Sequence, residues 1–346
     1  MTKDYAIIYN PVAAAGKLKD QFNFALKTLD KLNVSYQIFK TEHFQHAIDL
    51  SLDAAKDGLD VIGVGGDGTC NEVLNGVIKS NTNILLGFIP IGSGMDIPGA
   101  IGIRPDSIKR ACEIIAERKT GKSDIGLSIN AHNDQRYFLG IGSQGFDAEV
   151  TKRTNESLKS RKGTQNYVLT VLKTVFKFKK RKIRVTLDKE TWEGMANLVA
   201  VGNGPTYGGW MYMCPKANVH DGMFHISIID IASLPLLINF NSMYSRNFQP
   251  HKKVFEFVSK NVKIEMLNNE DVPYIGQIDG EIIGNLPITY KALREGYEFI
   301  QPMENEAEQW FQEKHGKKFA KYVNKLRKKG SSYYDDFMYL PKNLKI

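Results

Sequence analysis

The stretch VIGVGGDGTC, residues 61–70, places four glycines and one aspartate in and directly after a short apolar run. Such a run predicts a buried strand, and glycines at its end let a ligand approach the main chain closely. The amides of Gly65 to Thr69, at the start of a following helix, are typical of a phosphate site. Asp67 adds a carboxylate suited to holding a metal ion or accepting a proton there.

The first 125 residues alternate apolar strand-like runs with amphipathic helical patterns. Continuous apolar strands between helices indicate a doubly wound parallel sheet, in which ligands bind at the carboxyl ends of the strands. Four residues follow four different strands and would meet at that edge: Asn10, Thr41, Asp67 and Ser93. We therefore predict an α/β nucleotide-binding domain over residues 1–125.

Short strand-like pieces separated by glycine turns dominate after about residue 126, which favours an antiparallel sheet. We predict a β-rich substrate and metal domain over residues 126–300, with about residues 286–302 completing the first domain. Residues 303–346 follow as a basic amphipathic helix, at 304–329, and a tail. The apolar face of this helix fits either burial in a membrane surface or packing on the fold, and the pattern leaves both open.

The 346-residue chain is 42% hydrophobic and 24% charged, with a formal net charge of +8. It has three scattered cysteines, no signal-peptide pattern and no membrane-spanning apolar run, so we expect a cytoplasmic protein. Residues 152–184 hold twelve Lys/Arg against one acid, and residues 314–329 hold eight against none. Such blocks suit an anionic partner, either a membrane face or nucleic acid.

Two other phosphate motifs fit this chain poorly. GVGGDG, residues 63–68, matches the dinucleotide-binding glycine pattern, but it follows the third strand and lacks the acidic ribose partner. TGKS, residues 120–123, resembles the end of a P-loop, but Ala116 replaces the first glycine. For Asn71 and Glu72, just after the glycine turn, capping and ligand binding stay equally open.

The motif GGDGT, residues 65–69, resembles the signature of the diacylglycerol-kinase catalytic superfamily, which includes bacterial soluble lipid kinases and sphingosine and ceramide kinases. NAD kinases and phosphofructokinases share a related turn, so the resemblance implies an N-terminal domain like theirs. Further segments resemble the same family in order, from residue 5 to about residue 300: YNPVAAAGK, IPIGSGMDIPGAIGI, LGIGSQGFDAEV, PKANVHDGMFHISII and GQIDGEII. The resemblance implies ATP- and Mg²⁺-dependent transfer of a phosphoryl group to a lipid hydroxyl, foremost that of diacylglycerol.

The resemblance also implies which residues bind the nucleotide: Asn10, Pro11, Val12, Ala13, Ala14, Thr41, Gly65, Gly66, Asp67, Gly68, Thr69, Cys70, Asn71 and Ser93. Two positions depart from the family pattern. Met95 stands where an asparagine is usual, which puts one polar contact in doubt, and Ser93 replaces the commoner threonine but keeps a hydroxyl.

The metal and proton-transfer residues are likewise implied by the resemblance. Lys17 and Asp124 match a charged pair that supports a Mg²⁺-bound active site. A second, structural Mg²⁺ site is matched by Asp221 with the carbonyls of Asn218 and Met223. Glu281 matches the proton acceptor, and Asp67 is the alternative base.

We therefore expect a lipid kinase held peripherally on the inner, anionic face of the membrane by its basic blocks. The alternatives are a kinase for a sphingoid base, ceramide or phosphatidylglycerol, an NAD kinase, and a catalytically inactive lipid-binding protein. The basic blocks lack a known nucleic-acid motif, so we expect no nucleic-acid partner. A homodimer is left open.

Overall fold

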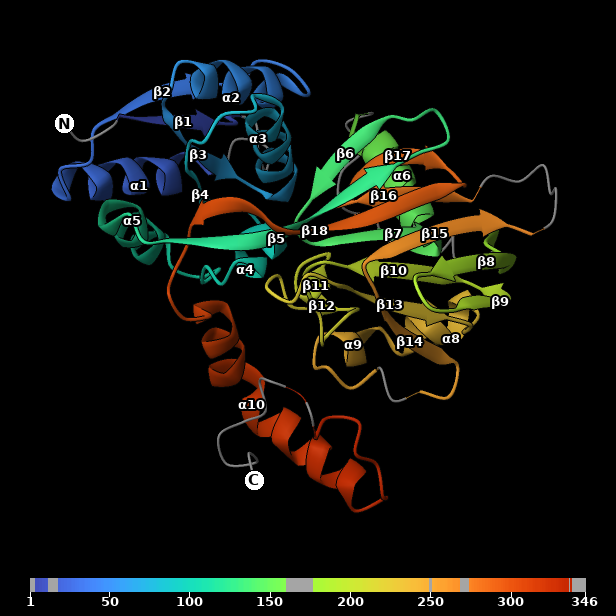
Figure 1. Cartoon of the computed structure of the whole chain (residues 1–346). Helices are drawn as coiled ribbons and strands as arrows, with labels where there is room; N and C mark the ends of the chain where they lie inside the picture. The colour runs from blue at the N-terminus through green and yellow to red at the C-terminus, as the bar shows by residue number, and fades with distance from the viewer. Residues whose placement is uncertain are drawn as a thin grey trace.

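The computed structural model describes residues 4–11, 18–159, 177–248, 251–267, 274–335 and 337. Its first part is a parallel sheet, in the order β2-β1-β3-β4, with strands β1 (Tyr5–Tyr9), β2 (Tyr36–Lys40), β3 (Asp60–Gly65) and β4 (Leu86–Pro90). The helices between and after these strands are α1 (Lys19–Lys31), α2 (His46–Lys56), α3 (Asp67–Lys79), α4 (Asp96–Ala100) and α5 (Ile108–Glu117). Together they form the α/β unit (Figure 1).

Helices cover both faces of this parallel sheet, which explains why its inner strands are apolar along their whole length. On one face, Phe22 of α1 and Ile115 of α5 pack in a cluster with Ile7 of β1. On the other face, Ala54 of α2 and Val73 of α3 pack in a separate cluster. The sheet is therefore doubly wound, as the sequence predicts.

A long strand, β18 (Ile288–Ile300), joins the α/β unit to the rest of the chain. Phe299 pairs in parallel with Leu86 of β4, while the strand pairs antiparallel with β5 (Thr120–Ile129) and β15 (Asn261–Met266). The sheet continues through β8 (Arg181–Leu187) to β9 (Thr191–Ala196), and β6 (Gln135–Phe138) extends it beside β5. One sheet thus runs through both halves of the molecule (Figure 1).

A second sheet packs on this extension and makes a β-sandwich, the β-rich unit. Its antiparallel strands are, in order, β14 (Val254–Ser259), β13 (Phe224–Ile229), β10 (Leu198–Gly202), β7 (Ile141–Gly145), β16 (Ile275–Ile278) and β17 (Glu281–Asn285). Val185 and Tyr290 of the first sheet pack with Val199 and Ile226 of the second. The expected fold, an α/β unit with an antiparallel β-rich unit, is confirmed.

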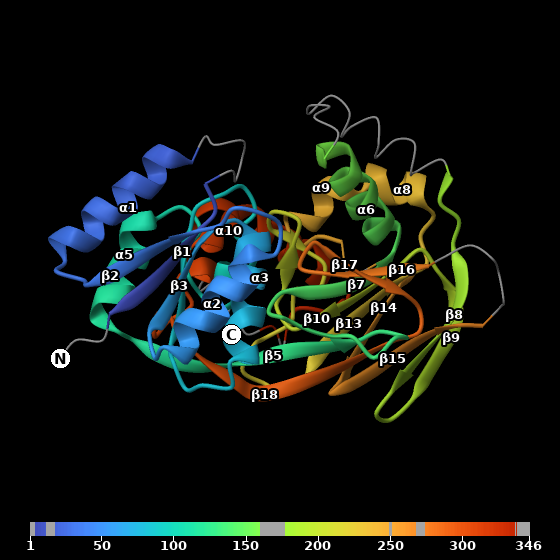
Figure 2. The same cartoon turned by 90° about the horizontal axis from the view of Figure 1, so that it is seen from above.

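Among the described residues, three helices and a short hairpin complete the β-rich unit. Helices α6 (Phe146–Lys159), α8 (Ser233–Ile238) and α9 (Phe240–Met243) lie together on one side of the second sheet (Figure 2). The hairpin consists of β11 (Thr206–Tyr207) and β12 (Met211–Tyr212). Its turn reaches back to the α/β unit, as the contacts of Asp96 below demonstrate.

The C-terminal helix α10 (Glu306–Arg327) packs its apolar face on the protein itself. The buried cluster there consists of Phe311, Phe319, Val323, Tyr212, Tyr334 and Phe337. Of the two alternatives that the sequence leaves open, packing on the fold is therefore confirmed, and burial of this apolar face in a membrane is wrong. The lysines of α10 remain on its other side.

TGKS begins strand β5, which agrees with its poor match to a phosphate-binding loop in the sequence. Helix α3 begins at Asp67, with Gly66 as its N-cap. Residues 160–176, the middle of the basic block at 152–184, lie outside the described residues. In the part of the chain that the structure describes, no helix is both long and apolar enough to cross a bilayer.

Candidate functional site

The carboxyl ends of the parallel strands bring the predicted nucleotide residues to one edge of the sheet. The Thr41 amide donates to the Tyr9 carbonyl (N···O 3.0 Å), so Thr41 lies beside Asn10 at the end of β1. The Ile91 amide donates to the Gly65 carbonyl (3.3 Å), so the ends of β3 and β4 are also adjacent. The carboxyl ends of these four strands therefore lie at the same edge of the sheet.

Close packing explains the glycines of these loops. A Cβ atom on Gly65 would lie 2.9 Å from Cβ of Thr69, and one on Gly92 would lie 3.0 Å from Cα of Gly66. Gly66, the N-cap of α3, has no atom within 4 Å of the place where its own Cβ would lie. The N-terminus of α3 therefore faces open space, and its amides are suited to an anion.

Two carboxylates, Asp67 and Asp96, face the same point at this edge. A methyl group on Gly94 would overlap Oδ2 of Asp67 and lie 3.5 Å from Oδ2 of Asp96. Oδ1 of Asp67 accepts a hydrogen bond from the Ile97 amide (2.9 Å). Loss of solvent contact raises the pKa of Asp67 to about 7, and the nearby charge of Asp96 is the second cause. Two carboxylates this close together favour a bound cation.

The sequence analysis misses Asp96, although the residue lies within the segment IPIGSGMDIPGAIGI. It is buried, and its carboxylate accepts the amides of Gly209 (2.7 Å) and Trp210 (2.9 Å) from the turn between β11 and β12. Burial also raises its pKa. Asp96 therefore joins the two units as well as facing Asp67. The available signal was an acid at a helix start, just after the glycines that follow the fourth strand.

Asn71 and Asp279 form a second buried link between the units. The Asn71 side-chain amide donates to the Tyr137 carbonyl (3.1 Å) and to Oδ2 of Asp279 (3.1 Å). Burial raises the pKa of Asp279 to about 6. Its carboxylate also accepts three backbone amides at 3.1 Å each, those of Leu139, Gly140 and Ile141. The Asn71 side chain is thus committed to the junction, and Asp279 is more than the turn residue that its sequence suggests.

Asn71→Asp is expected to lower the free energy of unfolding by about 3 kcal/mol or more, because a carboxylate oxygen would then face a carbonyl and a second carboxylate. Urea unfolding near neutral pH measures this change. The control is Asn23→Asp on the exposed face of α1, which should change stability little. Normal stability of Asn71→Asp with a raised KM for ATP would instead assign this side chain to the nucleotide.

The remaining predicted nucleotide residues occupy different environments. Thr69 and Cys70 are buried, and the Cys70 thiol belongs to the apolar core of the α/β unit. Glu72 accepts the amides of Gln45 (3.3 Å) and Ala47 (3.2 Å), so it caps the neighbouring helix α2. Pro11 follows Asn10 directly. Four predicted residues lie outside the described part of the chain, namely Val12, Ala13, Ala14 and Lys17.

Glu281, the first residue of β17, lies beside the glycine turn. Its Oε1 atom is 3.8 Å from the position that a Cβ on Gly68 would take. The residue follows the Asp279–Gly280 turn that connects β16 to β17. Both candidate bases, Glu281 and Asp67, are therefore placed at the first turn of α3.

The residues matched to the structural Mg²⁺ site lie together, away from the glycine turn. Asp124, matched in sequence to a charged pair with Lys17 at the active site, lies at this loop instead. The Asp124 carboxylate accepts the amides of Gly222 (2.6 Å) and Glu295 (2.7 Å), and Asp221 accepts the Met223 amide (2.9 Å). Protein groups thus already hold this loop. Within the described residues, no group of three His, Cys, Asp or Glu side chains is placed to hold a metal. Metal binding here stays a prediction.

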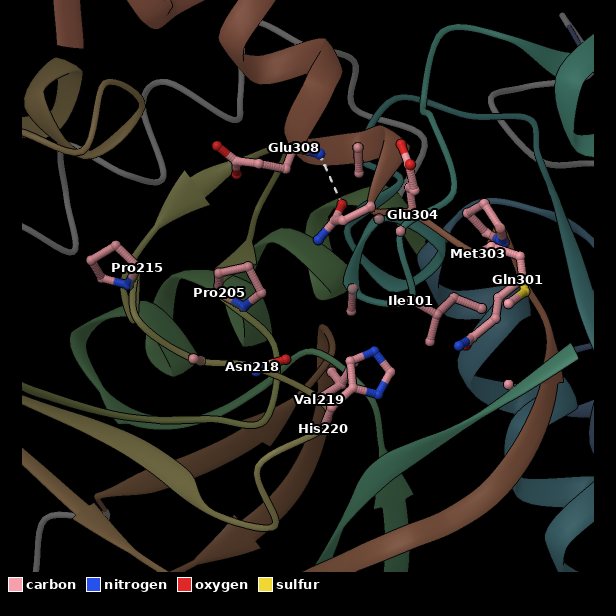
Figure 3. Close-up of a pocket in the computed structure, with 18 of the residues that line it drawn as sticks. Ile101, Pro205, Pro215, Asn218, Val219, His220, Gln301, Met303, Glu304 and Glu308 are labelled. Atoms are coloured by element: carbon pink, nitrogen blue, oxygen red, sulfur yellow. Dashed lines mark hydrogen bonds between the residues drawn. The ribbon is translucent and has the colours of Figure 1, made fainter. Parts of the chain in front are cut away.

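The same loop borders a cavity of about 540 Å³, which is also lined by the C-terminal end of α4 (Figure 3). Asn218, Val219 and His220 line one side of it, across from Gln301 and Glu304 in the segment that leads into α10. Asn218 therefore lies at this cavity and not among the residues of the glycine turn.

A larger cavity, of about 880 Å³, lies between the two units and reaches the paired carboxylates. Its polar end consists of Gly66, Asp67, Ser93, Asp96 and Asp279. Its other walls belong to the β-rich unit and are largely apolar, with Phe146, Val150, Leu198, Met211, Met213, Leu236, Leu237 and Met243. A site suited to phosphate thus opens directly into a chamber suited to hydrocarbon.

Comparisons with known proteins agree with this arrangement. Residues 4–128 match the model of the diacylglycerol kinase catalytic domain, and residues 140–298 match that of the YegS C-terminal NAD kinase beta sandwich-like domain. A Staphylococcus aureus protein named diacylglycerol kinase is 30% identical over 304 residues, which cover 87% of this chain and 93% of that protein. A Staphylococcus saprophyticus protein of the same name is 29% identical, over 87% and 96% of the two chains.

Two crystal structures from Bacillus anthracis share the fold. One superposes with a TM-score of 0.69 at 23% sequence identity, covering 87% of this chain and 98% of the other. The second, described as a diacylglycerol kinase, has a TM-score of 0.66 at 20% identity, covering 87% and 97%. Two family domains match along the chain, and the Staphylococcus aureus relative is 30% identical over 87% of it. The chain therefore belongs to the diacylglycerol kinase family of lipid kinases.

Proposed function

We propose that this kinase transfers the γ-phosphoryl group of ATP to the free hydroxyl of diacylglycerol and so makes phosphatidic acid. The observation that carries the proposal is the cavity of about 880 Å³, which joins paired carboxylates at a glycine turn to an apolar chamber. An apolar chamber of this size suits alkyl chains. NAD, the acceptor in the alternative reading, is polar along its length and would gain little from these walls.

The transfer couples one proton movement to one substitution at phosphorus. The lipid hydroxyl gives its proton to a carboxylate, its oxygen bonds to the γ-phosphorus, and the bond from that phosphorus to the bridging oxygen breaks to release ADP. Glu281 and Asp67 are the two candidate proton acceptors, since both lie at the first turn of α3. The amides at the start of α3 are suited to the charge on the phosphate oxygens.

Mg²⁺ fits the site because Asp67 and Asp96 turn their Oδ2 atoms to one point beside Gly94. Carboxylate oxygens are the ligands that Mg²⁺ usually takes from proteins. These two residues would hold the ion, which when bound neutralises charge on the phosphates. A base at Glu281 would then leave Asp67 free for this role.

The test is transfer of labelled phosphate from ATP in mixed micelles that contain anionic phospholipid. Diacylglycerol, sphingosine, ceramide, monoacylglycerol and phosphatidylglycerol are run in parallel, with NAD as the soluble acceptor. Label in phosphatidic acid supports the proposal. Label only in another lipid changes the substrate, whereas label only in NAD, or in nothing, contradicts it.

Titrating Mg²⁺ in two variants separates the roles of the carboxylates. If Asp67 holds the ion and Glu281 accepts the proton, Asp67→Asn should need far more Mg²⁺ for half-maximal rate. Glu281→Gln should then lose kcat at every Mg²⁺ concentration. The reverse pattern would make Asp67 the base.

We further propose that the mouth of the cavity binds the anionic, cytoplasmic face of the membrane. Leu236 and Leu237 of α8 line the cavity, while Leu234 and Ile238 of the same helix are 47% and 76% exposed. Lys180 pairs with Asp230 just before α8, which brings the cationic segment 177–184 beside this helix. Exposed apolar side chains next to lysines are typical of surfaces that lie on anionic bilayers.

The double variant Leu234→Asp/Ile238→Asp is expected to reduce binding to phosphatidylglycerol-containing vesicles about tenfold or more, because it removes two apolar side chains from the bilayer. Vesicle sedimentation measures the bound fraction. Met303→Asp, at a methionine that is 77% exposed near the start of α10, is the matched control. Undiminished vesicle binding by the double variant would rule out α8 as the contact.

A further inference from the structure

The turn that carries Glu281 to the first turn of α3 has only two residues, Asp279 and Gly280. Both have a positive φ, of 47° and 90°, as a tight hairpin turn requires, and Ile278 pairs with Glu281 across it. Gln277 holds this turn from one side, because its side-chain oxygen accepts the Gly280 amide at 2.7 Å. The backbone position of Glu281 is therefore set by the turn.

The Asp279 carboxylate fixes where the turn lies relative to the rest of the molecule. Its Oδ1 atom accepts the amides of Gly140 and Ile141, and its Oδ2 atom accepts the Leu139 amide and the Asn71 side chain, all at 3.1 Å. The Asp279 amide in turn donates to the Ile141 carbonyl at 3.1 Å. A carboxylate offers about four acceptor positions, so protein groups fill those of Asp279 and leave none for a metal ion or a proton.

These partners belong to both units. Asn71 lies in α3, one turn after Asp67 and Gly68, and residues 139–141 lead from β6 into β7. Oε1 of Glu281 is 3.8 Å from the position of a Cβ on Gly68. One carboxylate thus ties the turn that carries Glu281 both to its own sheet and to the helix whose first amides are suited to phosphate.

We propose that Asp279 is the positioning residue that holds Glu281 within reach of the lipid hydroxyl. The inference rests on the proposed lipid-kinase function and names Glu281 as the proton acceptor in it. A proton acceptor must lie within hydrogen-bond distance of the group that loses the proton, and a displacement of about 1 Å can cost about a hundredfold in rate. The hydrogen bonds of Asp279 therefore act on catalysis through Glu281.

A double-mutant cycle tests this role. Asp279→Asn keeps the shape of the side chain and tolerates a positive φ, but it turns an amide group toward amides. It is expected to lower kcat for dioctanoylglycerol about 10–100-fold and to leave the KM values for ATP and for the lipid within about twofold. In the Glu281→Gln background the same substitution should cause no further loss of kcat, because the group that it positions is already absent.

Gly280→Ala is the second variant, in case Asp279→Asn does not fold. A Cβ on Gly280 would meet no atom within 4 Å, so the substitution strains the turn only through its φ of 90°. It should likewise lower kcat when Glu281 is present and have no effect on kcat in the Glu281→Gln background.

Asp188→Asn is the matched control for a carboxylate that holds a turn. Asp188 also accepts hydrogen bonds from residues of a hairpin, namely Ser259, Lys260 and Asn261, but it does not line the 880 Å³ cavity. Its substitution should lower the melting temperature and leave kcat unchanged below that temperature.

Equal losses of kcat from Asp279→Asn with and without Glu281 would overturn the inference, and so would a change confined to KM. Full kcat in Glu281→Gln would overturn it too, while the lipid kinase stands. If the wild type labels no lipid, the proposed function fails as well.

Discussion

Asp67→Asn is expected to lower kcat for lipid phosphorylation by about 10³-fold or more, with the fold intact. The amide keeps the shape of the side chain and an oxygen that can accept the Ile97 amide. It removes the negative charge, which either holds Mg²⁺ or accepts the proton of the lipid hydroxyl. Initial rates with dioctanoylglycerol in mixed micelles, at saturating ATP, measure the loss.

The same substitution should leave the melting temperature unchanged or raise it. The pKa of Asp67 is raised from an ordinary value of 3.8 to about 7, so the free energy of unfolding falls as the pH rises from about 4 to about 7, and the full loss holds above that. A neutral amide removes the repulsion from Asp96, and the gain should be larger at about pH 8 than at about pH 5 in Mg²⁺-free buffer. Asp53→Asn, on the exposed face of α2, is the control and should change neither property. Full activity in Asp67→Asn, or a marked loss of stability, would assign Asp67 a structural role instead.

The parallel strands of the α/β unit are predictable because burial on both faces makes each one a continuous apolar run. Strand β18, which joins both units, is predictable only in part: about residues 286–302 are expected to complete the first domain, but the strands with which they pair are not identified. Its thirteen residues carry charged side chains along their length, and its pairing shifts register between Leu293 and Tyr297. Its partner in the parallel sheet, Leu86, lies some two hundred residues earlier, and no local pattern encodes such a pairing.

The residues of the candidate site differ in the same way, since some are predictable from a local motif and others depend on distant partners. Gly66 and Asp67 are predictable because their chemistry is contained in one short motif. The roles of Asn71 and Asp96 depend on residues of the β-rich unit, the Tyr137 carbonyl and the turn at Gly209. Those contacts exist only after the two units pack. From the sequence, Asn71 could cap the helix or bind a ligand, whereas in the structure its side chain joins the two units.

The environment of the C-terminal helix could not be predicted from its sequence. An apolar helix face that lies on a membrane and one that packs on protein have the same sequence pattern. Tyr212 and Arg246, which cover the apolar face of α10, come from distant parts of the β-rich unit. No feature of the helix itself identifies them. The buried ion pair that joins the helix to the β-rich unit is that between Arg246 and Glu308.

Glu308→Ala is therefore expected to lower the free energy of unfolding by about 3–5 kcal/mol, because it leaves a buried guanidinium without its charge partner. Arg246 is 2% exposed, and both of its terminal nitrogens donate to Glu308, with Nη1 2.9 Å from Oε1. The guanidinium carbon also lies 4.0 Å from the ring centre of Tyr212 and 3.8 Å from that of Phe311. These rings favour a cation but do not replace a carboxylate that accepts two hydrogen bonds. Denaturant unfolding measures the change.

Glu313→Ala is the matched control on the same helix. Glu313 also forms a two-bond pair, with Arg104, but its side chain is 57% exposed, and loss of such a pair should leave stability almost unchanged. The double variant Arg246→Met/Glu308→Leu should recover most of the stability, because apolar side chains of similar volume replace the pair without a buried charge. If Glu308→Ala were no more destabilising than Glu313→Ala, the buried pair would not be what holds α10 on the fold. Below the melting temperature kcat should not change in any of these variants, since none of these residues lines the 880 Å³ cavity.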